Sequence, residues 1–168
     1  MNRLNSIMPP INFGTIVRRP KSAQFIVNDF MAIILCLVGL IVAGMQECFL
    51  ESILFWASLI ISLCLIYRLI YLKQTIYYIT PEQLIYEHGV FHRSRDFIEL
   101  YRVIDFREES SFLQQLFGIK TIKVYSGDRT TPCLKMAGME RKDLLIPPIR
   151  DRVVINRKMN GIYEITNR

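Results

Sequence analysis

His88 and His92, two histidines four residues apart, are the first residues in this chain whose types could hold a metal ion. Glu87 and Asp96 flank them, and imidazole with carboxylate is a ligand set that zinc accepts. Gly89, however, lies between the histidines at the expected end of a strand, where the chain turns, so the side chains need not converge. We therefore expect no metal site here.

Asp105, Glu108 and Glu109 form an acidic group that could be considered for acid/base catalysis. The sequence places no nucleophile beside them, and such a group is typical of a solvated strand end. The glycines are isolated, and none belongs to a phosphate-binding loop that continues into Lys-Ser/Thr. These patterns predict no catalytic residue, no cofactor and no enzymatic activity.

Seven basic residues are candidates for contact with anionic lipid headgroups or with a partner protein. They are Arg18, Arg19, Lys21, Arg68, Lys73, Arg93 and Arg95. The chain carries a net charge of +6, and much of the excess lies before the first long apolar run. Anionic lipid is the simpler partner for charge in that position, so we predict membrane lipids as partners and no nucleic acid.

Two apolar runs separate these basic groups. Residues 30–45 and 52–67 contain no charged residue, and with their flanks each approaches the roughly 20 residues that cross about 30 Å of hydrocarbon. Neither run has a polar face, which disfavours buried helices of a soluble protein. A cleaved signal peptide is disfavoured because residues 1–22 are polar and contain three prolines. We expect transmembrane helices at about 25–45 and 50–72, joined by a short outer loop.

The flanking charges predict the orientation. Residues 1–24 form a basic segment with four Lys or Arg and no acid, whereas the loop between the apolar runs carries Glu47 and Glu51 and no base. Because positive flanks stay in the cytoplasm, both termini are predicted to be cytoplasmic. Asp29, at the start of the first helix, either lies at headgroup depth or pairs with Arg68.

Small residues form a stripe on each predicted transmembrane helix and would let the backbones approach closely. They are Ala32, Cys36, Gly39 and Ala43 on the first helix, and Ser58 and Ser62 on the second. We favour packing within the hairpin, and a homo-oligomer interface is the alternative.

Residues 74–168 predict a cytoplasmic α+β domain. Alternating apolar and polar side chains indicate strands at 75–80, 84–89, 90–100, 102–109, 119–126 and 132–137. Pro148 can start a terminal helix and Gly161 can end it. The tail "GIYEITNR" either pairs as a further strand or trails.

The stretch "SSFLQQLFG" predicts one short helix inserted among the strands. Ser110 or Ser111 can cap its start, and Gly118 can end it. Four apolar residues recur at spacings of three and four and share one face: Phe112, Leu113, Leu116 and Phe117. We expect this helix to act as a plug that covers apolar surface of the domain core.

The order of these elements resembles a known family. The run "YYITPEQLIYEHGVFHRSRDFIELYRVIDFREESSFLQQLFGIKTIKVYSGD", followed by "LKMAGM", is similar to the bacterial pleckstrin-homology-like (PH-like) domain that follows two transmembrane helices in YdbS-like membrane proteins. The resemblance implies a strongly bent antiparallel sheet folded into a partly open barrel, with a short inserted helix and a C-terminal helix covering its openings. It also implies no enzymatic activity and no cofactor.

The function expected from these observations is non-enzymatic. A bacterial inner-membrane protein would present its PH-like domain for protein–protein interaction or scaffolding. The alternatives are a membrane-tethered sensor of anionic lipid and an uncharacterised membrane enzyme. PH domains that hold phosphoinositides carry basic residues around the first hairpin loop, but here residues 80–83 contain an acid and no base. Arg93 and Arg95 are the nearest substitute for such a headgroup site.

Overall fold

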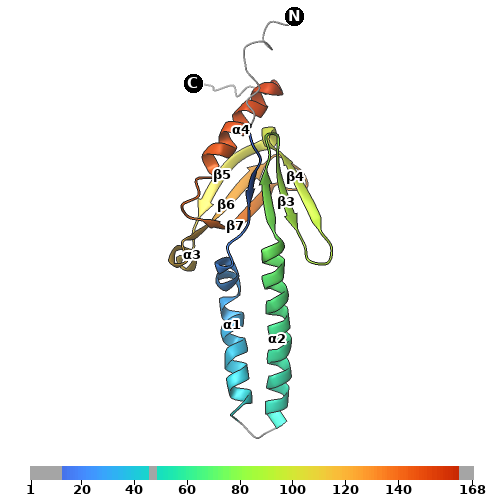
Figure 1. The fold of residues 1–168 in the computed structure, drawn as a ribbon, viewed down its shortest axis with the longest axis vertical. Helices are drawn as coiled ribbons and strands as arrows, with labels where there is room; N and C mark the ends of the chain where they lie inside the picture. The colour runs from blue at the N-terminus through green and yellow to red at the C-terminus, as the bar shows by residue number, and fades with distance from the viewer. Residues whose placement is uncertain (1–12, 46–48, 163–168) are drawn as a thin grey trace, which may run out of the picture.

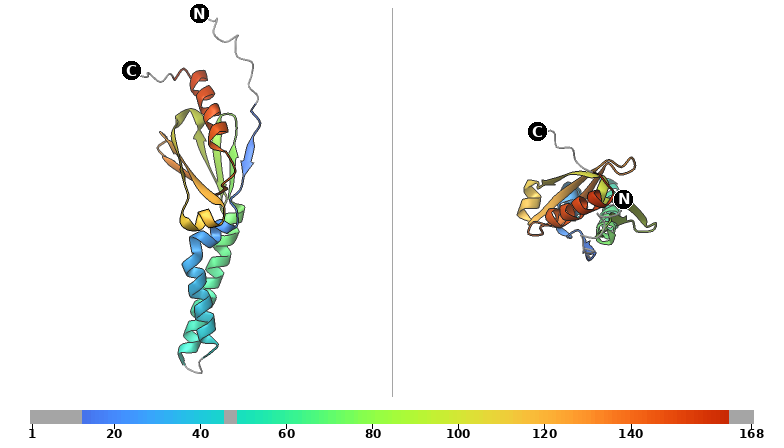
Figure 2. Two further views of the ribbon diagram at one scale, coloured as in Figure 1. Left: turned by 90° about the vertical axis from the view of Figure 1, so that its left-hand side faces the viewer. Right: turned by 90° about the horizontal axis from the view of Figure 1, so that it is seen from above.

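The computed structural model describes residues 13–45 and 49–162, and it has an α+β architecture (Figure 1). Two long helices project together from one end of a domain that contains antiparallel sheets, as the side view in Figure 2 also shows. Three features predicted from the sequence lie outside the described residues: the first half of the basic N-terminal segment, Glu47 of the loop, and the tail after Ile162.

Helices α1 (Ala23–Ala43) and α2 (Phe49–Gln74) form the hairpin. At 1.5 Å per residue, the 21 residues of α1 extend about 31 Å, which matches the hydrocarbon thickness of a bilayer. Ser58 is buried against α1, and Gly39 faces it so closely that a Cβ atom would not fit. The small residues therefore pack within the hairpin, the arrangement we favoured from the sequence.

The domain contains two antiparallel sheets that are not closed into a barrel. The first sheet has the order β1-β2-β3-β4, formed by Ile16–Arg18, Ile76–Ile79, Gln83–His88 and Ser94–Glu99. The second has the order β5-β6-β7, formed by Val103–Glu109, Ile119–Ser126 and Cys133–Glu140. A 3-10 turn, η1 (Leu100–Arg102), connects the two sheets. The strands predicted from alternation are all present.

Strand β1 was not predicted, and it lies before the hairpin in the chain. It pairs with β2 in the register Ile16↔Ile79. Two further contacts hold this segment on the domain. Arg152 donates a hydrogen bond to the carbonyl of Gly14 (2.7 Å), just before β1, and Arg18, at the end of β1, contacts Asp143 (2.9 Å). The domain is therefore built from residues that precede the two long helices in the sequence as well as from residues that follow them.

The core lies between the two sheets, under helix α4 (Ile146–Met159). Leu84, Ile98, Ile122 and Ile149 are among its fully buried side chains. Seen from above in Figure 2, α4 lies across the end of the domain that is remote from the hairpin. The side chain of Asn156 there donates a hydrogen bond to the carbonyl of Pro81, at 2.7 Å. The loop at residues 80–83 therefore faces away from the two long helices.

Helix α3 (Phe112–Leu116) forms where the sequence predicts it. Ser111 and Gln114 form a capping box, and Gly118 follows with a φ of +63°. The predicted role of its apolar face is wrong, however: Phe112 is 80% exposed and Leu116 71%.

Phe117, just after α3, is also exposed, and only Leu113 among the four apolar residues is half-buried. The residue that α3 buries is Gln114, which donates hydrogen bonds to Gln24 (2.9 Å) and Thr121 (2.8 Å). Because these bonds fix the polar side inward, the apolar side turns outward.

Candidate functional site

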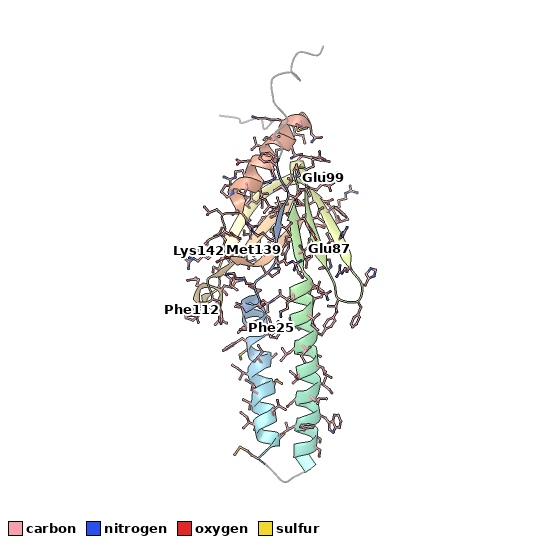
Figure 3. The ribbon with its side chains drawn as sticks, viewed as in Figure 1. Phe25, Glu87, Glu99, Phe112, Met139 and Lys142 are labelled. Carbon is pink, nitrogen blue, oxygen red and sulfur yellow. The ribbon has the colours of Figure 1, made fainter. Side chains whose placement is uncertain are left out.

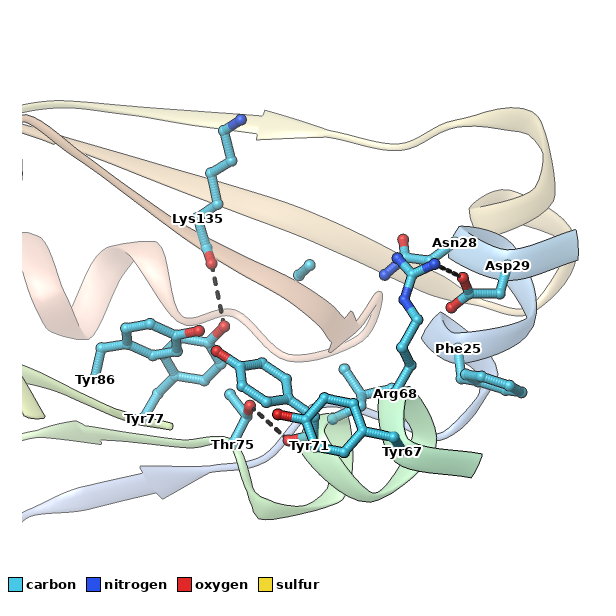
Figure 4. A pocket seen from close by; sticks show the side chains of 12 residues that line it. Phe25, Asn28, Asp29, Tyr67, Arg68, Tyr71, Thr75, Tyr77, Tyr86 and Lys135 are labelled. Atoms are coloured by element: carbon cyan, nitrogen blue, oxygen red, sulfur yellow. Dashed lines mark hydrogen bonds and ion pairs between the residues drawn. The ribbon is translucent and has the colours of Figure 1, made fainter. Parts of the chain in front are cut away.

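A cavity of about 430 Å³ lies where the hairpin meets the domain (Figure 4). Its wall includes an ion pair and four tyrosines: Asp29, Arg68, Tyr67, Tyr71, Tyr77 and Tyr86. These residues come from α1, α2, β2 and β3, so the cavity exists only when the hairpin and the first sheet are joined.

The join between hairpin and domain is short and hydrogen-bonded. Only Thr75 separates α2 from β2, and its buried hydroxyl donates to the carbonyl of Tyr71 at 3.1 Å. On the other side, the backbone N–H of Lys21 donates to the carbonyl of Gly138 in β7 at 2.9 Å. The two connections fix the orientation of the sheets relative to the helices.

Asp29 and Arg68 form the ion pair of the cavity. Asp29 has non-helical dihedral angles (φ −114°, ψ 16°), which kink α1. Its side chain is only 3% exposed and pairs with Arg68, whose side chain is 57% exposed. Of the two alternatives for Asp29, the structure confirms the pairing. The pair cancels the two charges, so this part of the cavity wall is close to neutral.

Aromatic rings extend from the cavity along β3. Tyr77 stacks on Tyr86 with ring centroids 5.1 Å apart, and Tyr86 stacks on His88 at 4.4 Å. The hydroxyl of Tyr77 donates to the carbonyl of Lys135 at 3.1 Å. Rings with a polar tip suit the boundary between hydrocarbon and water. The rings therefore form one aromatic cluster at the join of the hairpin and the first sheet.

Burial raises the pKa of both Tyr77 and Tyr86 above the usual tyrosine value of 10.0. The nearby Tyr86 raises the pKa of Tyr77 further, and the nearby Tyr71 raises that of Tyr86. Between pH 10 and the folded pKa, the unfolded chain therefore holds fewer protons than the folded one. Stability is expected to fall there by up to about 1.4 kcal/mol per pH unit for the buried Tyr77, and by less for the half-buried Tyr86, which water screens. Tyr77→Phe should remove the Tyr77 contribution when unfolding curves measured between pH 10 and pH 12 are compared with those of the wild type; an unchanged dependence of stability on pH would contradict the assignment.

Five of the seven predicted basic residues pair with carboxylates. Arg18 and Lys21 contact Asp143 and Glu140 of the domain, at 2.9 and 3.1 Å. Arg68 contacts Asp29, as described above. Arg19 and Lys73 are exposed, and neither has an ion pair within the described residues. Contact between any of the seven and lipid stays a prediction.

Arg93 and Arg95 converge on one buried carboxylate. Arg95 Nε lies 3.1 Å from Glu87 Oε2, and Arg93 Nη1 lies 3.7 Å from Glu87 Oε1. The role of Glu87 was missed at the sequence level, although a β3–β4 hairpin places Glu87 directly opposite Arg95. The partial neutralisation of both arginines gives no support to a dedicated phosphoinositide-type pocket at this place.

The candidates for catalysis and metal binding are dispersed. His88 Nδ1 lies 3.9 Å from Asp96, and no three His, Cys, Asp or Glu side chains come together among the described residues. In the acidic group, Glu108 contacts Lys120 at 3.1 Å. Lys123 contacts Glu109, and this hydrogen bond lowers the pKa of Glu109. These carboxylates stabilise the sheet through cross-strand pairs.

A family model described as "Bacterial PH domain" matches residues 24–146, which is more than half of the chain. No curated protein and no solved structure matches the chain. The matched region includes both long helices, all strands except β1, and the short helix α3. The predicted resemblance is thereby confirmed at the level of the PH domain, and the chain belongs to the bacterial PH domain family.

Proposed function

We propose that this membrane-associated PH-domain protein is a non-enzymatic scaffold of the bacterial inner membrane. Its hairpin crosses the membrane twice, both termini are cytoplasmic, and the domain binds a protein partner along the free edge of β4. The observation that carries the proposal is this unpaired, regular edge on a domain that the hairpin holds in a fixed orientation.

The charge distribution supports the cytoplasmic placement of the domain. Arg19, Lys21 and Lys73 flank the helices at the end where the hairpin joins the domain. Side chains such as Leu35 and Ile60 are exposed along the two helices, which is the arrangement expected for surfaces in contact with lipid tails.

The four edge strands differ in how well they are protected. β1 has only three residues, and β5 carries a register shift between Val103 and Asp105, which disfavours pairing with a further strand. In β7, the carbonyls of Lys135 and Gly138 already accept hydrogen bonds from Tyr77 and Lys21. β4 pairs with β3 over six residues without a shift, and among the described residues no further strand pairs with its other edge.

A partner strand that pairs with β4 would form main-chain hydrogen bonds along the edge and one apolar side-chain contact. Phe97, in the middle of β4, is 49% exposed and turned away from the core. Membrane attachment raises the effective concentration of the domain near any partner in the same membrane, so a weak contact is sufficient.

Site-specific photocrosslinking in native membranes tests the proposal. A photoreactive residue at Phe97 is expected to yield a discrete protein adduct, and the same residue at Val154, which is 45% exposed on α4, is the matched control. Equal adducts at both positions, or none at Phe97, would speak against recognition by β4.

Proline provides a second control. Backbone N–H groups alternate in direction along a strand, so one of Arg95 and Asp96 points its N–H away from β3. Proline at that position leaves the β3–β4 ladder intact and removes a donor that a partner strand needs. The two variants to compare are Arg95→Pro and Asp96→Pro. The one that keeps the wild-type circular dichroism spectrum should lose the Phe97 adduct.

A further inference from the structure

We propose that the face of the PH-like domain surrounding the hairpin is itself a lipid-binding surface, with two apolar contacts that enter the cytoplasmic leaflet. The first is the loop between β3 and β4, with Phe91 at its tip. The second is α3, together with Phe117. Figures 1 and 2 place this loop and α3 on opposite sides of the two helices. The inference rests on the proposed crossing of the membrane by the hairpin.

The β3–β4 loop brings Phe91 beside α2. Gly89, with a φ of +114°, makes the tight turn that a side chain would block against the His92 carbonyl. Phe91 is 93% exposed, yet its ring is stacked on Tyr67 at a centroid distance of 6.2 Å and an interplanar angle of 15°. The loop therefore extends past the join and along the helix.

The depth of Phe91 follows from its neighbour. Tyr67 lies about 10 Å along the helix from Gln74, the last residue of α2. Ile66 and Ile70, on either side of Tyr67 in the sequence, are exposed and apolar, as lipid-facing residues are. If α2 crosses the membrane, a ring stacked on Tyr67 lies at the depth of these two isoleucines.

Helix α3 lies beside the start of α1, at the end of the hairpin that joins the domain. The buried hydrogen bond between Gln114 and Gln24 joins it to the first turn of α1, at 2.9 Å. Figure 3 shows Phe112 on the side of the domain that faces the hairpin, near the level of Phe25. Phe112 thus directs its exposed side chain toward the place where the leaflet would begin, and the exposed Leu116 follows one helical turn later.

Lipid is the occupant that the chemistry favours for both contacts. Each apolar contact lies beside a helix that would cross the membrane, and each has exposed cations next to it. Arg93 follows Phe91 closely in the loop, and Arg141, whose N–H donates to the carbonyl of Gly118 at 3.0 Å, lies with Lys142 beside α3. Aromatic side chains with flanking cations match a leaflet that contains anionic headgroups.

Tryptophan fluorescence in nanodiscs that hold one full-length chain tests this inference. The chain has one tryptophan, Trp56, on α2 near the end remote from the domain. In a Trp56→Phe background, tryptophan is introduced by Phe91→Trp, by Phe112→Trp, or by Val154→Trp as the control on α4. The nanodiscs contain phosphatidylglycerol and phosphatidylethanolamine, with acyl chains brominated close to the headgroup.

The tryptophans introduced by Phe91→Trp and Phe112→Trp are expected to lose most of their fluorescence in brominated lipid and to resist aqueous iodide. The Val154→Trp control should show the reverse. Iodide quenching of all three variants without an effect of bromine would overturn the inference. So would protection of Phe112→Trp from both quenchers, because a second protein surface would then cover α3.

The native Trp56 separates this inference from the function on which it rests. Quenching of Trp56 by lipids brominated along the chain, without quenching of the two new tryptophans, would reject the lipid-binding surface and keep the membrane crossing. Failure to quench Trp56 would reject the crossing itself, whatever the behaviour of Phe91→Trp and Phe112→Trp.

Discussion

Replacing Arg68 with alanine is expected to lower the free energy of unfolding by about 3 kcal/mol, because the buried carboxylate of Asp29 then loses its charged partner. Removal of one member of a buried ion pair costs about 3–5 kcal/mol. The effect should lie near the lower end of this range, since the side chain of Arg68 is 57% exposed and water can reach its side of the pair. The loss should appear as unfolding at lower denaturant concentration in detergent micelles or nanodiscs.

A double-mutant cycle provides the control. Asp29→Asn removes the charge that Arg68 compensates, so Asp29→Asn with Arg68→Ala should be clearly more stable than Arg68→Ala alone. Arg68→Lys keeps a positive charge and should retain much of the stability. If the double variant is no more stable than Arg68→Ala, the ion pair does not account for the loss.

Gly138→Ala is expected to have the second large effect, about 2–4 kcal/mol. Gly138 has a φ of +73°, which costs an alanine about 1–2 kcal/mol. The new Cβ would also lie 2.8 Å from the Cβ of Gln24 and 3.2 Å from that of Pro20, a contact that forces β7 away from the start of α1. The variant should therefore weaken the join between hairpin and domain as well as the domain itself.

Gly118→Ala is the matched control for this prediction. Gly118 also has a positive φ, of +63°, but a Cβ there would meet no atom within 4 Å. Gly118→Ala should therefore show the backbone cost alone, and the difference between the two variants in thermal unfolding measures the steric part. Equal destabilisation by both substitutions would show that the contact with Gln24 contributes nothing.

Much of the fold could be predicted from the sequence because its signals are local. Alternating side chains predicted the strands after the hairpin, and charge-free runs predicted the two long helices. The caps of α3 at Ser111 and Gly118 were also visible as residue types. The pairing of Asp29 with Arg68 was one of two alternatives, since an acid at such a position needs either water or a base.

What could not be predicted depends on contacts between distant residues. β1 has three residues and becomes a strand only because β2 presents an edge to it after the hairpin has folded back. The spacing of apolar residues in α3 correctly gave a shared face, but not the direction in which that face points. Hydrogen bonds from Gln114 to Gln24 and Thr121 decide that direction, and the local sequence pattern does not predict these bonds.

The placement of β1 before the hairpin has a consequence for biosynthesis. The ribosome releases β1 first, and its partner β2 emerges only after both helices have been made. If one helix alone crossed the membrane, β1 and β2 would be on opposite sides and the register Ile16↔Ile79 could not form. Completion of the first sheet therefore requires an even number of crossings. If the hairpin crosses the membrane as proposed, a chain with a single inserted helix would be left with the first sheet incomplete.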